Sequence, residues 1–178
     1  MKAKRASTSD WIDAGIDLLR SGGEDDLTID RLAKRVRRTK GSFYHHFKDI
    51  DAFRRALLEA WKSSHTMAPI AHAEGESVPR RRPKLYEVVG LLDHRLELAI
   101  RGWSARSDDA RVAVGEVDAR RVDYLTTLWL HQASATRARE LAEIEYAAFL
   151  GFLQRFGERY VEHAKEMHLL VRALEKLG

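Results

Sequence analysis

The chain has 178 residues and no Cys, and 44% of its residues are hydrophobic and 33% charged. This composition is typical of a globular protein with a packed core, and the lack of Cys excludes disulfides, thiolate nucleophiles and Cys-based zinc sites. No apolar run approaches the roughly 20 residues that span a bilayer, and the basic start MKAKRASTSD is not followed by the apolar segment of a signal peptide, so we expect a cytoplasmic protein without a membrane partner.

Positive charge is concentrated in the first third of the chain. The net charge is +4, and residues 1–66 hold 14 Lys and Arg against 10 Asp and Glu, so they carry the whole excess. Within this third, residues 31–48 contain seven cations and no acidic residue. Such a segment indicates contact with a polyanion, although a solvated basic helix face is the plainer alternative.

Four short helices are predicted in residues 1–66. Apolar residues recur at helical spacing in each, and Gly22 and Gly23 end the first helix. Thr28, Thr39 and Asp49 are the predicted N-caps of the second, third and fourth helices. The second and third helices, joined by a tight turn, match the spacing of a helix-turn-helix unit.

The stretch TKGSFYHHF forms the predicted third helix, where Phe43 and Phe47 share one face. That face would anchor the helix to its neighbours, and Tyr44 on the flank could offer its hydroxyl to a phosphate. A metal site is the alternative interpretation, but adjacent His residues on a helix diverge by about 100° and cannot easily share one ion. We therefore predict a nucleic-acid contact and no metal site or cofactor.

Residues 27–53, LTIDRLAKRVRRTKGSFYHHFKDIDAF, resemble the N-terminal DNA-binding domain of the TetR family of transcriptional regulators. The resemblance rests on Thr28, on the run Thr39 to Ser42, and above all on the Tyr44, His46 and Phe47 core. It implies that double-stranded operator DNA is contacted by Thr28, Thr39, Lys40, Ser42, Tyr44, His45 and Lys48, and we expect the added charge of Arg38 to contact it too. For His46 we prefer a packed, hydrogen-bonded side chain at the helix end to a base contact.

Three positions depart from the family pattern. Arg37 stands where the family usually has Gly, Arg38 stands where it has an apolar residue, and Ile50 replaces a common Lys. A residue other than Gly at positive φ costs on the order of 1 kcal/mol, so the turn is either strained or differently shaped. The added Arg residues favour affinity over sequence reading.

The rest of the chain also has helical periodicity. We expect a loop or linker over residues 69–83, because it contains all three Pro, then one long helix over 85–103, another after the break at 104–110, and two over 137–156 and 158–176. The fold class is therefore all-α, with about nine helices. Residues 1–48 form the expected helix-turn-helix domain, 49–66 a connecting helix, and 67–178 a C-terminal effector-binding and dimerisation domain.

The last two predicted helices are more apolar than a monomer of this size requires. An internal core is one explanation, and a homodimer interface, which the TetR resemblance implies, is the other. The expected interface residues are Ala148, Gly151, Phe152, Phe156, Met167 and Val171. Large side chains on the middle helices are candidates for an effector pocket, although side chains of this kind more often belong to the core: His94, Trp103, Tyr124 and Trp129.

No motif of a hydrolase, metalloprotease or nucleotide-binding loop occurs, so we predict that the protein is not an enzyme. The expected function is that of a TetR-type repressor, released from a palindromic operator by a small-molecule effector. The alternative is a helical interaction protein of the same fold with only non-specific DNA binding.

Overall fold

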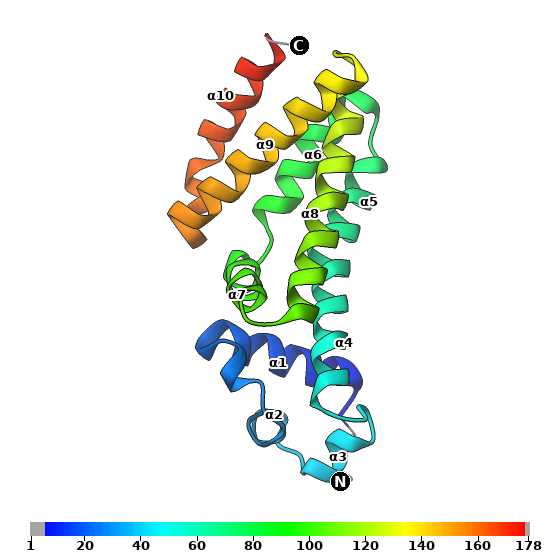
Figure 1. The fold of residues 1–178 in the computed structure, drawn as a ribbon, viewed down its shortest axis with the longest axis vertical. Coiled ribbons are helices and arrows are strands. Elements are labelled where there is room, and N and C mark those ends of the chain that lie inside the picture. The colour runs from blue at the N-terminus through cyan, green and yellow to red at the C-terminus, as the bar shows by residue number, and fades with distance from the viewer. Residues whose placement is uncertain (1–5, 177–178) are drawn as a thin grey trace.

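The computed structural model describes residues 6–176, apart from the side chains of residues 158, 161 and 164, and every regular element in that range is helical. Figure 1 shows the N-terminal helices at one end of an elongated molecule and the C-terminal helices packed side by side at the other. The α-helices are α1 (Thr8–Gly22), α2 (Ile29–Val36), α3 (Lys40–Tyr44), α4 (Ile50–Lys62), α5 (Ala68–Glu74), α6 (Val78–Gly90), α7 (His94–Ser104), α8 (Asp108–Trp129), α9 (Ala135–Phe156) and α10 (Ala164–Glu175).

Three shorter elements complete the chain: the 3₁₀ turns η1 (Glu24–Asp26) and η3 (Gly157–His163), and the π-helical segment η2 (Ser63–Met67). Because η2 joins α4 to α5 without interruption, the ten α-helical segments of the described chain form nine separate rods. The all-α prediction of about nine helices is confirmed.

The predicted N-caps of the N-terminal helices are present. Thr28, Thr39 and Asp49 each have extended backbone, and each side-chain oxygen accepts a hydrogen bond from the N–H three residues ahead. These bonds satisfy backbone donors that a helix leaves free in its first turn. The caps fix where α2, α3 and α4 begin, and so fix the turn between α2 and α3.

An aromatic cluster holds α3 against its neighbours. Phe43 is fully buried, and its ring centroid lies 5.4 Å from Trp11, 5.3 Å from Phe47 and 5.8 Å from Phe53. These rings come from α1, α3, α4 and the residues after α3. Because α3 has only five residues, this packing supplies the stability that so short a helix lacks by itself.

The expected linker over residues 69–83 is wrong, because most of α5 and the first turns of α6 occupy it. Pro79 lies in the first turn of α6, where a missing N–H costs nothing, whereas Pro69 lies within the continuous helix of α4, η2 and α5, and Pro83 lies inside α6. Pro69 also cannot bond to the carbonyl of His65, four residues earlier, and Arg121 donates to that oxygen instead at 3.1 Å. The helix therefore continues through the proline with its freed carbonyl satisfied.

The single helix expected over residues 85–103 is also wrong. It divides into α6, which ends at Gly90, and α7, whose N-cap Asp93 accepts a hydrogen bond from the N–H of Leu96. The apolar spacing of the segment continues across this break and therefore concealed it. The expected break at residues 104–110 is present, and Ser107 caps α8.

Two hydrophobic cores lie along the molecule, and α8 contributes to both. Its first half adds Ala110, Ala113 and Val117 to the core of the N-terminal helices, and its second half adds Leu125 and Trp129 to the core of α5, α6, α9 and α10. The division expected after residue 66 falls inside η2, within continuous helix. Within residues 6–176, no helix is both long enough and apolar enough to cross a membrane.

Candidate nucleic-acid interface and internal cavity

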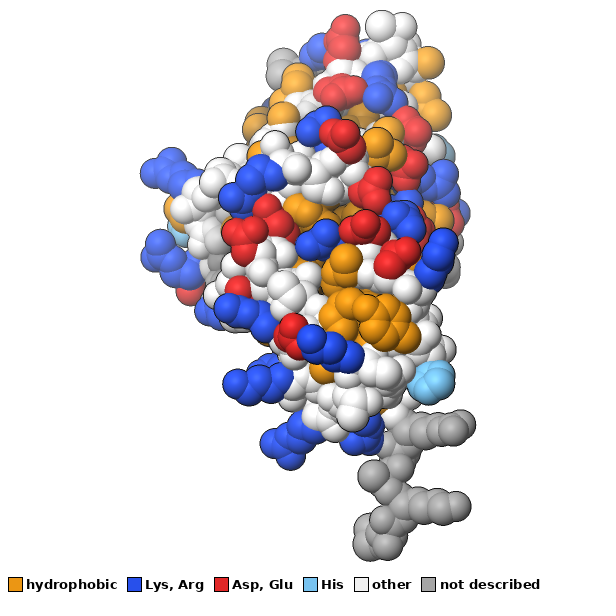
Figure 2. Space-filling model, turned by 60° about the horizontal axis from the view of Figure 1, so that its bottom comes forward, with side chains coloured by type: hydrophobic (Ala, Val, Ile, Leu, Met, Phe, Trp, Pro, Cys, Tyr) orange, Lys and Arg blue, Asp and Glu red, His pale blue; other side chains and the backbone are white. Residues whose placement is uncertain are grey.

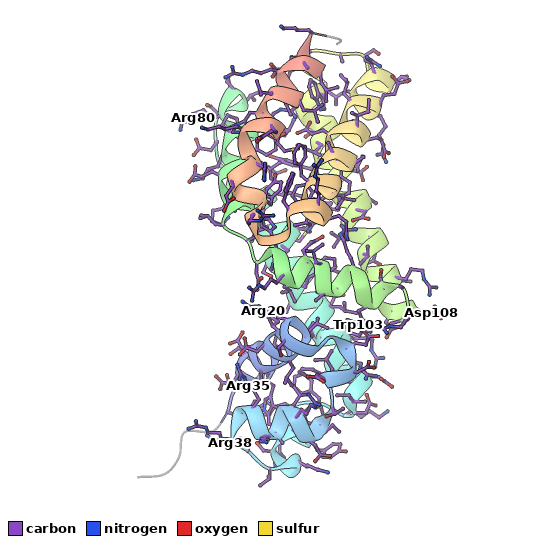
Figure 3. All side chains as sticks on the ribbon, turned by 90° about the vertical axis from the view of Figure 1, so that its left-hand side faces the viewer. Arg20, Arg35, Arg38, Arg80, Trp103 and Asp108 are labelled. Carbon is purple, nitrogen blue, oxygen red and sulfur yellow. The ribbon has the colours of Figure 1, made fainter. Side chains whose placement is uncertain are left out.

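The side chains expected to contact DNA gather at the end of the molecule formed by α2 and α3. Arg38 and Ser42 are half-buried, and the other six are exposed. Figure 2, which looks toward this end, shows Lys and Arg side chains standing out from it with few acidic groups among them. Figure 3 places Arg38 at the same end. The arrangement presents cations and hydroxyl groups together on one surface.

Tyr44 has the geometry of a side chain that packs and reaches outward at once. Its ring packs edge-on against Phe43 with centroids 5.6 Å apart, while 56% of the residue stays exposed. The inward ring keeps the side chain in place, so that the phenol can face a ligand at little cost in conformational entropy.

Lys40 is already paired within the protein. Its Nζ lies 2.6 Å from Oδ1 of Asp30, and this hydrogen bond raises the pKa of Lys40. Both side chains are exposed, so the pair is screened by water and weak. Asp30 therefore competes with any anion that approaches Lys40.

The turn between α2 and α3 keeps its left-handed shape although it lacks Gly. Arg37 has φ 57° and ψ 49°, and it is the one residue other than Gly with positive φ among those described. Its N–H still donates to the carbonyl of Lys34 at 3.2 Å. The departure at Arg37 therefore leaves the turn shape intact and places strain in the backbone.

His46 lies behind the exposed face. It is half-buried, its Nδ1 lies 3.2 Å from the hydroxyl oxygen of Thr8, and its ring lies 6.3 Å from that of Trp11. These contacts agree with the packed, hydrogen-bonded role expected for His46, and they tie α1 to the residues that follow α3.

An internal cavity of about 70 Å³ lies among η2, α5, α6, α7, α8, α9 and α10. Its walls are mainly apolar, but charged and polar side chains also reach it. The lining residues are His65, Thr66, Pro69, Ile70, Leu85, Tyr86, Val89, Leu92, His94, Glu97, Arg121, Tyr124, Leu125, Glu145, Tyr146, Phe149 and Met167.

Arg121 is held by hydrogen bonds on every side. It donates to both carboxylate oxygens of Glu97 at 2.8 and 3.0 Å, to Thr66 at 3.0 Å, to Tyr146 at 3.2 Å and to the carbonyl of His65 at 3.1 Å. A guanidinium has five N–H donors, so all of them are used. Arg121 therefore fixes η2, α7, α8 and α9 relative to one another.

Glu97 is the buried acceptor of this network and is only 2% exposed. It also accepts hydrogen bonds from Arg101 at 2.9 Å and from the indole N–H of Trp61 at 3.1 Å. Burial by itself would raise the pKa of Glu97, but Arg121 and Arg101 lower it to about 2. The carboxylate is thus ionised, and through Trp61 it connects the cavity directly to α4.

A second buried carboxylate, Glu145, closes the other side of the cavity. It accepts hydrogen bonds from Arg82, from Tyr86 and, at 2.7 Å, from the indole N–H of Trp129. The guanidinium of Arg82 also lies over the Trp129 ring, 4.2 Å from its centroid. Both buried carboxylates therefore have a cationic partner.

Of the four residues expected to form an effector pocket, His94 and Tyr124 line the cavity. Trp129 lies behind it and holds Glu145. Trp103 belongs to the core of the N-terminal helices, and Figure 3 places it at the end of α7 nearest those helices. It reaches that core because α7 packs across α1, a tertiary contact that helical periodicity does not reveal.

Sequence reasoning missed the charged cavity residues. Glu97 and Arg121 have the spacing of ordinary surface residues, and only their packing shows that they face inward. Glu97 lies between Leu96 and Ile100, two buried residues of the apolar stripe, and this position was a weak indication that Glu97 itself is buried.

The residues expected at a dimer interface divide into two groups. Ala148, Phe152 and Phe156 are half-buried on α9 and Gly151 is exposed, and a β-carbon built on Gly151 would meet no described atom within 4 Å. Met167 and Val171 are buried in the chain's own interior, so they are not available to a partner. The exposed apolar residues Ile144 and Leu169 extend the surface of α9 and α10 instead.

Comparison with known proteins agrees with this architecture. Residues 12–57 match the model of the family described as bacterial regulatory proteins, tetR family. The transcriptional regulator AcuR of Cereibacter sphaeroides is 33% identical over 76 residues, which are 42% of this chain and 35% of AcuR. The match thus spans about a third of that relative's length.

Two solved structures share the fold over nearly the whole chain. One, described as a transcriptional regulator of the TetR/AcrR family, has a TM-score of 0.69 and 21% identity, and the match covers 96% of this chain and 95% of that one. A transcriptional regulator from Rhodococcus sp. Rha1 has a TM-score of 0.64 and 17% identity, with 94% and 97% covered. The N-terminal part of the chain thus matches the tetR family of bacterial regulatory proteins, and the chain has the same fold as these two solved regulators.

Proposed function

We propose that this protein is a homodimeric transcriptional repressor that binds a palindromic operator and releases it when a small molecule occupies the internal cavity. The observation that carries the proposal is the outward face of α3, where Thr39, Lys40 and Tyr44 stand exposed on a helix that Phe43 anchors. A helix with anchored aromatics and an exposed polar face can enter a major groove without losing its packing. Because it acts on DNA, we place the protein in the cytoplasm.

Pairing of two copies through α9 and α10 would match the two-fold symmetry of a palindromic operator. One helix-turn-helix unit contacts one half-site, and two-fold pairing supplies the second about 34–36 Å away. The outward strip formed by Ile144, Ala148, Gly151 and Phe152 on α9, with Leu169 on α10, supports this pairing, since it combines exposed apolar groups with the open space at Gly151.

The network around Glu97 supports a coupling between the cavity and the DNA-binding helices. Trp61 lies on α4, which follows directly after the helix-turn-helix unit, and bonds to the same carboxylate that Arg121 holds at the cavity wall. A ligand that displaces Glu97 or Arg121 would therefore move α4 and change the separation of the two α3 helices. That change would favour release of the operator.

Selection of the purified protein against random duplex DNA at about 150 mM salt tests the proposal. We expect an enriched palindrome with half-sites about one helical turn apart. Retention of DNA without an enriched sequence would refute operator recognition and favour the alternative, a helical interaction protein that grips phosphates only. The strain and added charge at Arg37, together with Arg38 and Ile50, keep that alternative open.

Two substitutions at the Lys40–Asp30 pair sharpen this test. Lys40→Ala removes a cation from the surface and should weaken binding and reduce the salt slope by about one. Asp30→Asn frees Lys40 from its partner and should strengthen binding. If both variants bind the selected DNA like the parent protein, then Lys40 does not face the duplex.

A further inference from the structure

Most cations of residues 31–40 already have a partner in the folded chain. Three of them form ion pairs with Asp side chains: Arg31 with Asp26, Arg35 with Asp17 and Lys40 with Asp30. Arg38 donates a hydrogen bond to the carbonyl of Arg37 at 3.0 Å. Only the side chains of Lys34 and Arg37, both exposed, have no partner among the residues that the structure describes. These two cations are therefore the ones available to an external anion.

The backbone of Arg37 is strained, and no contact of its side chain offsets the strain. Its φ of 57° and ψ of 49° are unfavourable for a residue with a β-carbon, whereas Gly adopts them readily. The backbone hydrogen bonds of this turn would form equally well with Gly. Strained residues gather at sites that bind ligands, so the Arg side chain indicates a function rather than a role in folding.

Lys34 and Arg37 also repel each other. They lie three positions apart, and the N–H of Arg37 donates to the carbonyl of Lys34 at 3.2 Å, so their side chains start from the same turn. Like charges at this spacing destabilise a helix end. The carbonyl end of α2 attracts either cation but does not remove their mutual repulsion. An anion beside both of them would.

The position of the pair indicates which anion this is. Arg37 lies in the turn that leads into α3, two residues before Thr39, the N-cap of that helix. Figure 3 places Arg35 and Arg38, which flank Arg37 in the chain, at the end of the molecule formed by α2 and α3. A helix seated in a major groove brings the turn before it close to the phosphates that border the groove.

We propose that Lys34 and Arg37 bind phosphates of the DNA backbone beside the groove that α3 enters. Arg offers a planar fork of N–H donors that matches a phosphate, and Lys offers a compact charge. Neither residue is among the eight expected to contact DNA, and Arg37 stands where the tetR family usually has Gly. The inference rests on the proposed function for DNA binding alone, since a phosphate carries no sequence information.

The salt dependence of DNA binding tests both residues. The full-length protein and its Arg37→Gly and Lys34→Gln variants are titrated onto a fluorescent duplex of random sequence, and binding is followed by anisotropy between about 50 and 200 mM salt. Each lost phosphate contact lowers the slope of log affinity against log salt by about 0.9, so the fold-loss of affinity over this range should shrink about threefold in each variant. Unchanged slopes in both variants overturn the proposal, and an unchanged slope in one removes that residue from the site.

Two substitutions at Arg37 separate DNA contact from folding. Arg37→Gly relaxes the left-handed turn, so it should unfold at a higher urea concentration than the parent protein and yet bind DNA more weakly. Weaker binding by a more stable variant cannot result from unfolding. Arg37→Lys keeps both the charge and the strain, so its salt slope should stay near that of the parent protein. A slope as low as that of Arg37→Gly would contradict a contact made through charge.

Arg80→Gln is the control for net charge. The Arg80 side chain is exposed, and Figure 3 places it at the opposite end of the molecule. The substitution removes one positive charge, as Arg37→Gly does, but at a distance that salt screens almost completely. We expect the salt slope of the parent protein. A slope lowered as much as in Arg37→Gly would show an effect of net charge and overturn the phosphate contact.

Random-sequence DNA keeps this test separate from the test of operator recognition. Lowered slopes in the two variants, together with a parent protein that enriches no palindrome, would support the phosphate contact and refute operator recognition. An enriched palindrome with unchanged slopes in both variants would do the reverse.

Discussion

Replacement of Glu97 by Gln tests whether the buried network holds the two ends of the molecule together. The change keeps the shape of the side chain but removes its charge, and it leaves Arg121 buried with no anionic partner at that position. A pKa of about 2 in place of the ordinary 4.5 corresponds to about 3 kcal/mol in favour of the ionised carboxyl, at about 1.4 kcal/mol for each pH unit. Breaking a buried ion pair typically costs about 3–5 kcal/mol, in agreement.

We therefore expect Glu97→Gln to lower the free energy of unfolding by about 3 kcal/mol at pH 7. The measurement is urea denaturation at fixed protomer concentration, because dimerisation would make stability depend on concentration. Glu116→Gln is the control, since that carboxylate pairs with Lys62 at 2.6 Å but is largely exposed, and its loss should cost less than about 1 kcal/mol. Equal losses in the two variants would refute the reasoning.

The pH dependence of the same variant gives a second test. Because the folded pKa of Glu97 lies below its ordinary value, the unfolded chain takes up the proton first as pH falls. The stabilisation is complete above about pH 4.5 and is lost as pH falls toward about 2. Glu97→Gln should flatten the stability curve over this range, and an unchanged slope would contradict the assignment.

Three further predictions concern other parts of the chain. Arg37→Gly should raise the free energy of unfolding by up to about 1 kcal/mol, because Gly adopts the left-handed turn without strain. The control Arg35→Gly, inside α2, should lower the free energy of unfolding by about as much. Both values are measured by urea titration, and destabilisation by both substitutions would disprove the strain at Arg37. Gly151→Arg should leave the monomer folded but abolish dimers in sedimentation, while Gly102→Arg, equally open on α7, should leave dimers intact. The two cavity imidazoles have lowered pKa values when folded, so unfolding should become easier as pH falls below about 6.5, and replacing both by Gln should reduce that slope in urea titrations at pH 7.5 and 5.5.

Local features of the N-terminal helices could be predicted from the sequence because their causes are local. A capping Thr or Asp acts on a backbone N–H three residues away, and Gly23 ends α1 through its own backbone. Phe43 and Phe47, four residues apart, fall on one face by spacing alone. The outward face of α3 follows from the same spacing, since whatever does not anchor a short helix is exposed.

Interactions between distant segments could not be predicted in the same way. Three prolines in fifteen residues indicated a loop, but the tertiary contact of Arg121 with the carbonyl of His65 lets the helix pass Pro69. Met167 and Val171 have the spacing of an interface, and only the position of α10 turns them inward.

The sequence by itself determined the all-α class, the boundaries of the first four helices and the resemblance of the N-terminal segment to the tetR family, because capping, periodicity and motif spacing act over a few residues. Tertiary structure decided the cavity and its chemistry. Glu97 and Arg121 lie 24 positions apart and become an ion pair only when α7 packs against α8, and the cavity is lined by residues from seven helical elements. Burial changes the protonation and the available hydrogen bonds of such groups, and burial is a property of the packed chain.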